Sequence, residues 1–315
     1  MTGQITLVTG STGFIGSRLL RPGDKALVRR YTGKHNEILG DICEPESLLD
    51  VCRGVTSIFH CAGIAHLRTA SNITLANNVN FHGTKNLLKV AGESGVRNFV
   101  YISSVKAMPS PGEQCVDEDW QGIPDDEYGL SKLKAEKAVL EAGQKFGMNV
   151  VNLRLAMVYG KNAKGNLNAM AKAINAGWFP PLPETGNRRS MVHVRDVVEA
   201  ARLVLGNKSA NQKTYIVAHP EAVSSKFLYD TLCEALIGYR RNWSVPEGFF
   251  RFGGVVGDVV EKITKFNVQI NSKLISKLLD SECYSSERLK NELGWEPKVN
   301  LQLGCKEMFH DKKIF

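Results

Sequence analysis

The chain has 315 residues, of which 43% are apolar and 23% charged, the composition of a globular protein that can bury a sizeable core. Its net charge of +8 is spread among acidic residues without an aromatic-rich basic tract, which argues against nucleic-acid binding. No apolar run approaches the roughly 18 residues that span a bilayer, and glycines interrupt the most apolar late stretch, Phe249 to Val260. With a strand predicted almost at the N-terminus, we expect a soluble cytoplasmic protein without a targeting signal or membrane span.

Cysteine usage points to the same compartment. The seven cysteines form no CxxC pair, are odd in number and have no histidine cluster nearby. A disulfide framework or zinc site would need tighter spacing. We therefore predict free thiols in a reducing compartment and no metal site.

The first 155 residues alternate β-rich runs with helical patterns. Strands are predicted at Ile5–Thr9, Ala26–Arg29, Ser57–Cys61, Asn98–Ser103 and Asn149–Leu155, and helices at Glu46–Cys52, Leu75–Ser94 and Tyr128–Lys145. Strands with apolar flanks that alternate with helices indicate a parallel sheet covered on both faces. We predict an α/β fold of the Rossmann type, with a doubly wound parallel sheet.

The regular alternation of predicted strands and helices ends at about residue 160. Closely spaced prolines make 178–183 irregular, whereas a helix at Val194–Leu205 and a strand at Thr214–Ala218 suggest a return to the sheet. From about Ser224 the pattern is mainly helical. We predict an NAD(P)-binding Rossmann domain over 1–160, to which 186–220 returns. A smaller, mainly helical substrate lobe would comprise 161–185 and 221–315.

A glycine-rich segment follows the first predicted strand. Its G-x-x-G-x-x-G spacing permits a tight turn, close approach to a pyrophosphate, and packing of helix on strand, while the helix N-terminus attracts the anion. Pro22 and Gly23 limit that helix to about two turns. The segment predicts phosphate binding by Gly10, Thr12, Gly13, Phe14, Ile15 and Gly16.

Arg29 and Arg30 end the second predicted strand, where NAD-binding folds usually carry an acidic residue for the ribose hydroxyl. A guanidinium binds a 2′-phosphate bidentately. A solvated surface pair is the alternative reading. The pattern favours NADP(H), with Arg29 as the contact, and leaves NAD(H) open.

Tyr128 and Lys132 lie one helical turn apart on one face of a predicted helix. A positive charge about 4–5 Å from a phenol could lower its pKa by two to three units at most, into the range useful for proton transfer. Ser104 follows the strand 24 residues upstream of Tyr128 and would reach the same substrate oxygen, because carboxyl ends of parallel strands line the ligand crevice. These three residues are the predicted catalytic group.

Together these motifs resemble the extended short-chain dehydrogenases/reductases of the NAD-dependent epimerase/dehydratase family. The resemblance runs from about Ile5 to Met308 and includes the glycine loop, the serine strand and the tyrosine–lysine pair. It selects Ser104 over Ser103 as the active serine and implies that Tyr128 and Lys132 also contact the cofactor. Further cofactor contacts that it implies are Asp41, Ile42, Cys61, Ala62, Gly63 and Asn80.

The resemblance extends to two later segments, 154–160 and 188–196. It implies that Arg189 holds the nucleotide diphosphate, a role suited to a bidentate guanidinium, and that Asn166 touches the sugar diphosphate. A surface arginine pair is the alternative for Arg188 and Arg189.

The nearest branch of that family comprises UDP-sugar 4-epimerases and 4-ketoreductases of O-antigen and capsule synthesis. Because Arg29 and Arg30 favour NADPH, the leading hypothesis is a UDP-4-keto-hexose reductase of surface polysaccharide synthesis. The alternatives are a UDP-glucose or UDP-GlcNAc 4-epimerase, a steroid- or flavonoid-type reductase, and a non-catalytic NADP-sensing regulator. The expected partner is a UDP-hexose substrate, and a homodimer is left open.

Overall fold

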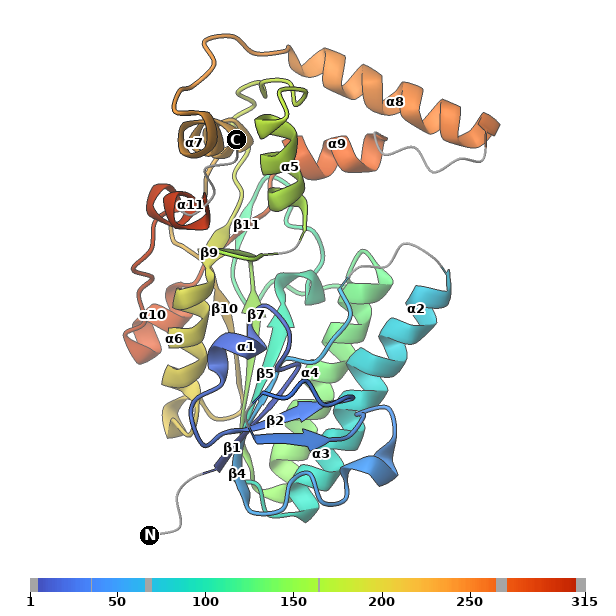
Figure 1. The fold of residues 1–315 in the computed structure, drawn as a ribbon, viewed down its shortest axis with the longest axis vertical. Helices are drawn as coiled ribbons and strands as arrows, with labels where there is room; N and C mark the ends of the chain where they lie inside the picture. The colour runs from blue at the N-terminus through green and yellow to red at the C-terminus, as the bar shows by residue number, and fades with distance from the viewer. Residues whose placement is uncertain (1–4, 35, 66–69, 164, 265–270, 310–315) are drawn as a thin grey trace.

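The computed structural model describes residues 5–34, 36–65, 70–163, 165–264 and 271–309. A seven-stranded sheet forms its centre, in the order β10-β7-β5-β4-β1-β2-β3, with every neighbouring pair parallel (Figure 1). The strands are β1 (Ile5–Thr9), β2 (Lys25–Val28), β3 (Asn36–Leu39), β4 (Val55–His60), β5 (Asn98–Ser104), β7 (Asn149–Leu155) and β10 (Lys213–Val217). The predicted doubly wound Rossmann-type sheet is confirmed.

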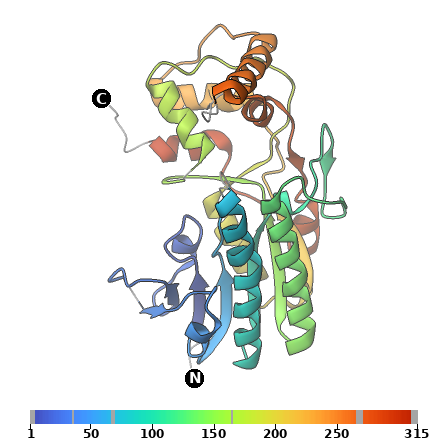
Figure 2. The same cartoon turned by 90° about the vertical axis from the view of Figure 1, so that its right-hand side faces the viewer.

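Neighbouring residues of one strand face opposite sides of the sheet and pack into different hydrophobic cores. Leu7 and Phe99 face the side covered by α2 (Ala70–Asn77), α3 (Thr84–Glu93) and α4 (Glu127–Phe146), which stand beside one another in Figure 2. Their neighbours Val8 and Val100 face the side covered by α1 (Gly16–Leu19) and α6 (Val194–Val204). Because both faces are covered, the inner strands carry apolar residues on both sides of the sheet instead of on one side only.

A mainly helical lobe lies beyond the carboxyl ends of the strands (Figure 1). It contains α5 (Asn166–Asn175), α7 (Ser225–Ile237), α8 (Glu247–Thr264), α9 (Ser272–Leu279) and α11 (Leu301–Phe309). The short parallel pair β8 (Met157–Tyr159) and β9 (Met191–His193) joins it to the sheet. Unlike the other helices after residue 221, α10 (Glu287–Leu293) packs against the sheet. Leu289 and Trp295 belong to the same hydrophobic core as Val8. No helix within the described ranges is long and apolar enough to cross a membrane.

Three predicted helices differ from the observed ones. The first helix is a single turn, because the chain turns at Pro22 and the Asp24 carboxylate accepts a hydrogen bond from Arg21 N at 2.8 Å. The predicted helix 46–52 is a 3-10 turn at Pro45–Leu48, followed by turns. The predicted helix 75–94 is interrupted by a π-helical turn at Asn78–Gly83. Strand β3 was not predicted, since it is short, polar and lies at the sheet edge.

The prediction of free thiols is wrong for two of the seven cysteines. Cys115 and Cys283 form a disulfide across the parallel pair β6 (Cys115–Val116) and β11 (Cys283–Tyr284). The two residues are 168 positions apart, a distance at which sequence spacing carries no information about pairing. The other five cysteines are free.

This disulfide predicts a specific thiol count. Denatured but unreduced protein should expose five reactive thiols, and reduction should raise the number to seven. The double variant Cys115→Ser/Cys283→Ser should also lose free energy of unfolding, by up to about 5 kcal/mol for so long a loop, because the bridge restricts the unfolded chain. Urea unfolding of both proteins measures that loss. Seven reactive thiols without reductant would contradict the bridge.

Candidate active site

The glycine loop joins β1 to α1 by close backbone approaches. Gly10 has φ +63°, and a Cβ placed on it would lie 2.7 Å from Ala62 N, beyond the end of β4. A Cβ on Gly16 would lie 2.3 Å from the Gly10 carbonyl oxygen, which also accepts a hydrogen bond from Gly13 N at 2.9 Å. The spacing of the three glycines therefore reflects contacts that any side chain would break.

A cavity of about 920 Å³ opens beside this loop, where the sheet order reverses between β1 and β4. Its size suits a dinucleotide, and the switch point is where open α/β sheets bind ligands. The predicted residues that line it are Gly10, Thr12, Gly13, Arg29, Asp41, Ile42, Cys61, Ala62 and Gly63. Phe14, Ile15 and Gly16 do not line it, and Ile15 packs into the core instead.

The far end of the cavity carries both cationic and anionic side chains. Arg29 and Arg30 line it, are exposed, and have no ion pair or hydrogen-bonding side-chain partner in the described parts of the chain. Asp41 also lines it, and its Oδ1 accepts a hydrogen bond from Cys43 N at 2.9 Å. Two unpaired guanidinium groups at this end are available to an anionic ligand.

Asn80 lies in the π-helical turn and is fully buried. Its side chain accepts from Ile64 N at 2.8 Å and donates to Ile64 O at 3.0 Å and to Ser131 Oγ at 3.0 Å. Asn80 thus fastens the loop after β4 to helix α4, one residue before Lys132. The wider π turn is what brings this side chain inward at that point.

Ser104 and Tyr128 meet where β5 ends and α4 begins. The Tyr128 hydroxyl is hydrogen-bonded to the Ser104 side chain. Gly129 permits this, because a Cβ there would lie 2.0 Å from the Lys106 carbonyl oxygen, and Asp126 caps the helix by accepting from Gly129 N at 2.8 Å. Ser103 points the other way and donates to Glu136 Oε1 at 2.5 Å. Of the two serines, only Ser104 is placed beside the tyrosine.

Lys132 is buried beneath this pair. Its Nζ donates to Ile102 O at 2.7 Å and lies 4.3 Å from the centre of the Tyr101 ring. Burial lowers the pKa of Lys132 to about 8, and the nearby Glu136 carboxylate opposes this shift. The Nζ also lies 3.9 Å from the position a Cβ would take on Gly63, so the ammonium borders the cofactor cavity.

The phenol of Tyr128 does not have the lowered pKa that the sequence suggested. Burial raises its pKa to about 12, and the hydrogen bond from Ser104 only partly offsets this. The ammonium of Lys132 is directed to the Ile102 carbonyl and the Tyr101 ring instead. Tyr128 is therefore protonated at neutral pH.

The two predicted substrate residues lie apart from the glycine loop. Arg189 is mostly buried, donates to Asp280 O at 3.0 Å and lies 3.7 Å from Glu282 Oε2. Glu282 in turn accepts from Lys106 Nζ at 2.5 Å, close to the end of β5. An anionic substrate would compete with Glu282 for both cations. Asn166 is exposed at the first residue of α5.

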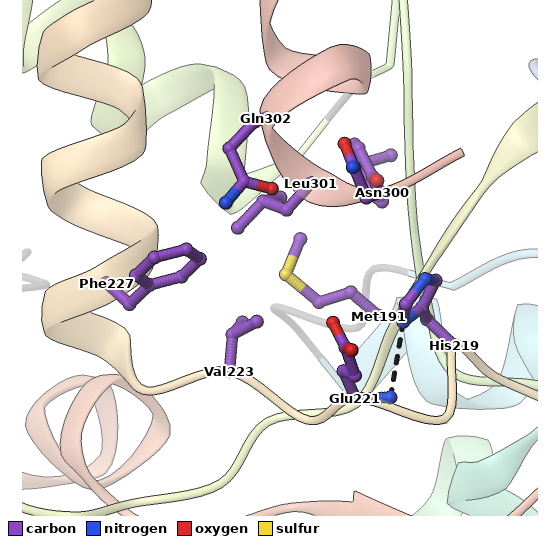
Figure 3. A pocket seen from close by; sticks show the side chains of 9 residues that line it. Met191, His219, Glu221, Val223, Phe227, Asn300, Leu301 and Gln302 are labelled. Atoms are coloured by element: carbon purple, nitrogen blue, oxygen red, sulfur yellow. Dashed lines mark hydrogen bonds between the residues drawn. The ribbon is translucent and has the colours of Figure 1, made fainter. Parts of the chain in front are cut away.

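A second, much smaller cavity lies within the lobe (Figure 3). Its volume is about 60 Å³, and Met191, Val223, Phe227 and Leu301 form its apolar wall. His219 and Glu221 are joined across its rim by a 3.2 Å hydrogen bond from Glu221 N to His219 Nδ1. It is too small for a nucleotide sugar and contains none of the predicted site residues.

Comparison with known proteins places the chain in a family. A model of the "NAD dependent epimerase/dehydratase family" matches residues 6–218. The chain belongs to this family. Its enzymes are of the short-chain dehydrogenase/reductase type, and the matched range includes Ser104, Tyr128 and Lys132.

Curated relatives cover nearly the whole chain. A UDP-glucose 4-epimerase of Vibrio cholerae is 30% identical over 96% of this chain and 93% of its own. An N-acetyl-alpha-D-glucosaminyl-diphospho-ditrans,octacis-undecaprenol 4-epimerase of Escherichia coli O157:H7 is 26% identical over 98% and 96%. Among solved structures, a UDP-N-acetylglucosamine 4-epimerase from Bacillus cereus aligns with a TM-score of 0.77 at 20% identity, over 99% and 98%. The UDP-glucose 4-epimerase of Thermus thermophilus, in complex with NAD, reaches 0.73 at 23%, over 98% and 99%.

Several residues at the site escaped sequence reasoning. Further cavity-lining residues are Thr9, Leu27, Val28, Thr32, Gly40, Cys43, Ile64, Leu75 and Val79. Thr9 and Ile64 directly adjoin predicted residues and could have been found from the strand ends. Glu136 and Glu282 could not, because their role depends on partners far away in the sequence.

The raised pKa of Tyr128 predicts how the protein titrates. Absorbance of tyrosinate near 295 nm should be the same for the unmodified protein and Tyr128→Phe up to about pH 11, since an ordinary phenol ionises near pH 10 and this one near 12. Because the folded pKa exceeds the unfolded one, the stabilisation from this phenol is lost as pH rises from 10 towards 12. A difference of about half a phenol between the two proteins at pH 10, which an ordinary tyrosine would give, would contradict the assignment.

Proposed function

We propose that this chain catalyses hydride transfer at C4 of a diphosphate-linked hexose, with 4-epimerisation as the leading reaction. The observation that carries the proposal is the contact of Ser104 with Tyr128 at the start of α4, with the buried Lys132 one turn later beside Gly63, which lines a cavity that fits a dinucleotide. Near-full-length relatives named as 4-epimerases of UDP-glucose and of an undecaprenyl-diphospho sugar support the substrate class. The latter also supports a place in surface polysaccharide synthesis.

The residues suit both directions of such a reaction. A bound nicotinamide cofactor supplies the acceptor or donor for the hydride of C4. In reduction, Tyr128 donates its phenolic proton to the C4 ketone oxygen while Ser104 donates a hydrogen bond to the same atom. The Lys132 ammonium stabilises the resulting phenolate, and in oxidation Tyr128 takes the proton back.

One observation favours a second candidate, reduction of a UDP-4-keto-hexose with NADPH. Arg29 and Arg30 line the cavity and have no acidic partner among the described residues, as a 2′-phosphate site requires. Epimerases retain their cofactor and return the hydride to the other face, whereas ketoreductases exchange it each turnover. The Thermus thermophilus neighbour is described as a complex with NAD, which supports NAD as the alternative cofactor.

Incubation without added cofactor separates the two reactions. An epimerase should interconvert UDP-glucose with UDP-galactose, or the N-acetyl forms, using only the nucleotide retained on purification. The control Tyr128→Phe should lower the rate at least a hundredfold through loss of the proton donor. If conversion requires stoichiometric NADPH and a 4-keto substrate, the epimerase reading is wrong and the reductase stands. Inactivity of both kinds with nucleotide-linked and with undecaprenyl-diphosphate-linked hexoses would remove the whole proposal.

Cofactor choice depends on Arg29 if the reductase reading holds. Arg29→Asp should weaken NADPH binding about tenfold or more and leave NADH binding nearly unchanged, because only the former loses a phosphate contact. Fluorescence titration of each nucleotide measures this. Arg53→Asp is the matched control, since Arg53 is similarly exposed but lies outside the cavity. Equal losses for both nucleotides, or none, would contradict a 2′-phosphate site.

A further inference from the structure

Helix α8 crosses the end of the lobe farthest from the sheet (Figure 1). Its large apolar side chains point outward, where Phe249 is 70% and Phe252 69% exposed. Val255, Val256 and Val259 are exposed on the same side, since they recur three or four residues apart. We refer to these five residues as the α8 face.

The opposite side of α8 makes the helix's contacts. A Cβ on Gly254 would lie 3.0 Å from Ser272 Cα of α9, and Asp258 Oδ1 accepts a hydrogen bond from Ser272 N at 3.1 Å. Phe250 packs against the core of the lobe. The charged residues keep to the flank, where Arg251 pairs with Glu247 at 2.6 Å. No charged position falls within the α8 face.

This arrangement reverses the usual pattern of a surface helix, whose solvent side is polar. A phenylalanine carries roughly 150–250 Å² of surface, so two of them and three valines form a contiguous apolar patch of several hundred Å². Patches of that size on soluble proteins mark places where another surface binds. The α8 face therefore calls for a partner that the described residues do not supply.

Charge around the face points to what that partner is. Among the described residues of α8 and α9, Arg251 is paired with Glu247 and Asp280, whereas Lys262, Lys273 and Lys277 form no ion pair with another described residue. Lys262, Lys273 and Lys277 are exposed. A second copy of the chain would bring these cations against their own equivalents, because a two-fold interface pairs a patch with itself. The cationic surplus complements an anionic surface instead.

Exposed aromatic side chains complete the pattern. Trp243 follows α7 and Trp178 follows α5, and both are exposed. Their segments lie together, since Val245 N donates to Pro181 O at 3.1 Å and Arg241 Nη1 to Phe179 O at 3.2 Å. An apolar helix side, exposed lysines on the same helix (Lys262) and on the neighbouring α9, and nearby tryptophans are features of helices that lie in the headgroup region of a bilayer.

We propose that the α8 face docks this protein onto an anionic lipid bilayer, with α8 in the plane of the interface. The helix does not span the membrane, and the lobe binds it reversibly. This inference rests on the surface of the lobe alone and is independent of the reaction proposed above. Binding is driven by burial of the α8 face and assisted by attraction of the surrounding lysines to acidic headgroups.

Vesicle sedimentation with the full chain tests the docking. The protein should sediment with phosphatidylglycerol/phosphatidylethanolamine vesicles and much less with phosphatidylcholine alone. Phe249→Ser/Phe252→Ser should lower the partition coefficient roughly tenfold or more, because two aromatic anchors are lost. Leu49→Ser is the matched control, since Leu49 is 70% exposed on the other lobe and should leave binding unchanged.

A separate pair of variants tests how much the lysine charges contribute to vesicle binding. Lys273→Glu/Lys277→Glu should weaken binding to the anionic vesicles and reduce its dependence on salt. Lys85→Glu/Lys89→Glu changes an equally spaced, exposed pair on α3 and should have no effect. In the unmodified protein, the fluorescence of Trp178 and Trp243 should also shift to shorter wavelength on anionic vesicles. This measurement does not depend on the folding of any variant.

Two results would overturn the proposal. One is the absence of both sedimentation and a fluorescence shift with anionic vesicles at low salt. The other is a concentration-dependent dimer that Phe249→Ser/Phe252→Ser dissociates while no vesicle binding occurs, which would assign the α8 face to a second copy of the chain. Sedimentation velocity distinguishes that outcome.

Discussion

The burial of one ammonium group organises the catalytic side of the molecule. Lys132 sits at the sheet surface, where the Ile102 carbonyl and the Tyr101 ring receive it, and the Glu136 carboxylate lies near enough to raise its pKa. Glu136 is itself neutralised by Arg154 at 2.8 Å. A buried cation is tolerable only with such partners, because desolvation otherwise favours its neutral form. The same contacts join α4 to β5 and β7, so the fold and the site share one set of interactions.

The protonation state of Tyr128 depends on burial and on contacts with other elements, which the spacing of Tyr128 and Lys132 in the sequence does not reveal. In the ligand-free protein the phenol is desolvated, which favours the protonated acid. Ser104 provides a hydrogen bond, and Gly129 brings α4 against the Lys106 carbonyl so that the two side chains meet. In the proposed reduction, negative charge that develops on the phenol would lie one helical turn from the buried Lys132 ammonium, in a site where electrostatic stabilisation is strong. On that proposal, Tyr128 is the acid and its ionised form is stabilised during turnover.

Local chemistry was predictable from the sequence, and contacts between distant segments were not. The glycine loop, the ends of the apolar strands and the Tyr128–Lys132 spacing each lie within a few residues, so patterns reveal them. The π turn at Asn80 depends on the tertiary hydrogen bonds of that side chain to Ile64 and Ser131. The Cys115–Cys283 bridge and the Glu282 contacts with Lys106 and Arg189 join segments about 90 to 180 residues apart. The direction of the Tyr128 pKa shift depends on burial, which no spacing encodes.

Helix α8 shows a second limit of sequence patterns. An apolar stripe at helical spacing looks the same whether it faces a core or the solvent, and the usual expectation is a core. Here Gly254 lies against α9 and leaves room for close packing, and Gly257 three residues later is buried, while the bulky residues lie on the other side. Small residues inside and large apolar residues outside are the reverse of what folding alone would select, because the outward Phe249 and Phe252 contribute little to the stability of an isolated chain. Their energetic contribution arises when another apolar phase covers them.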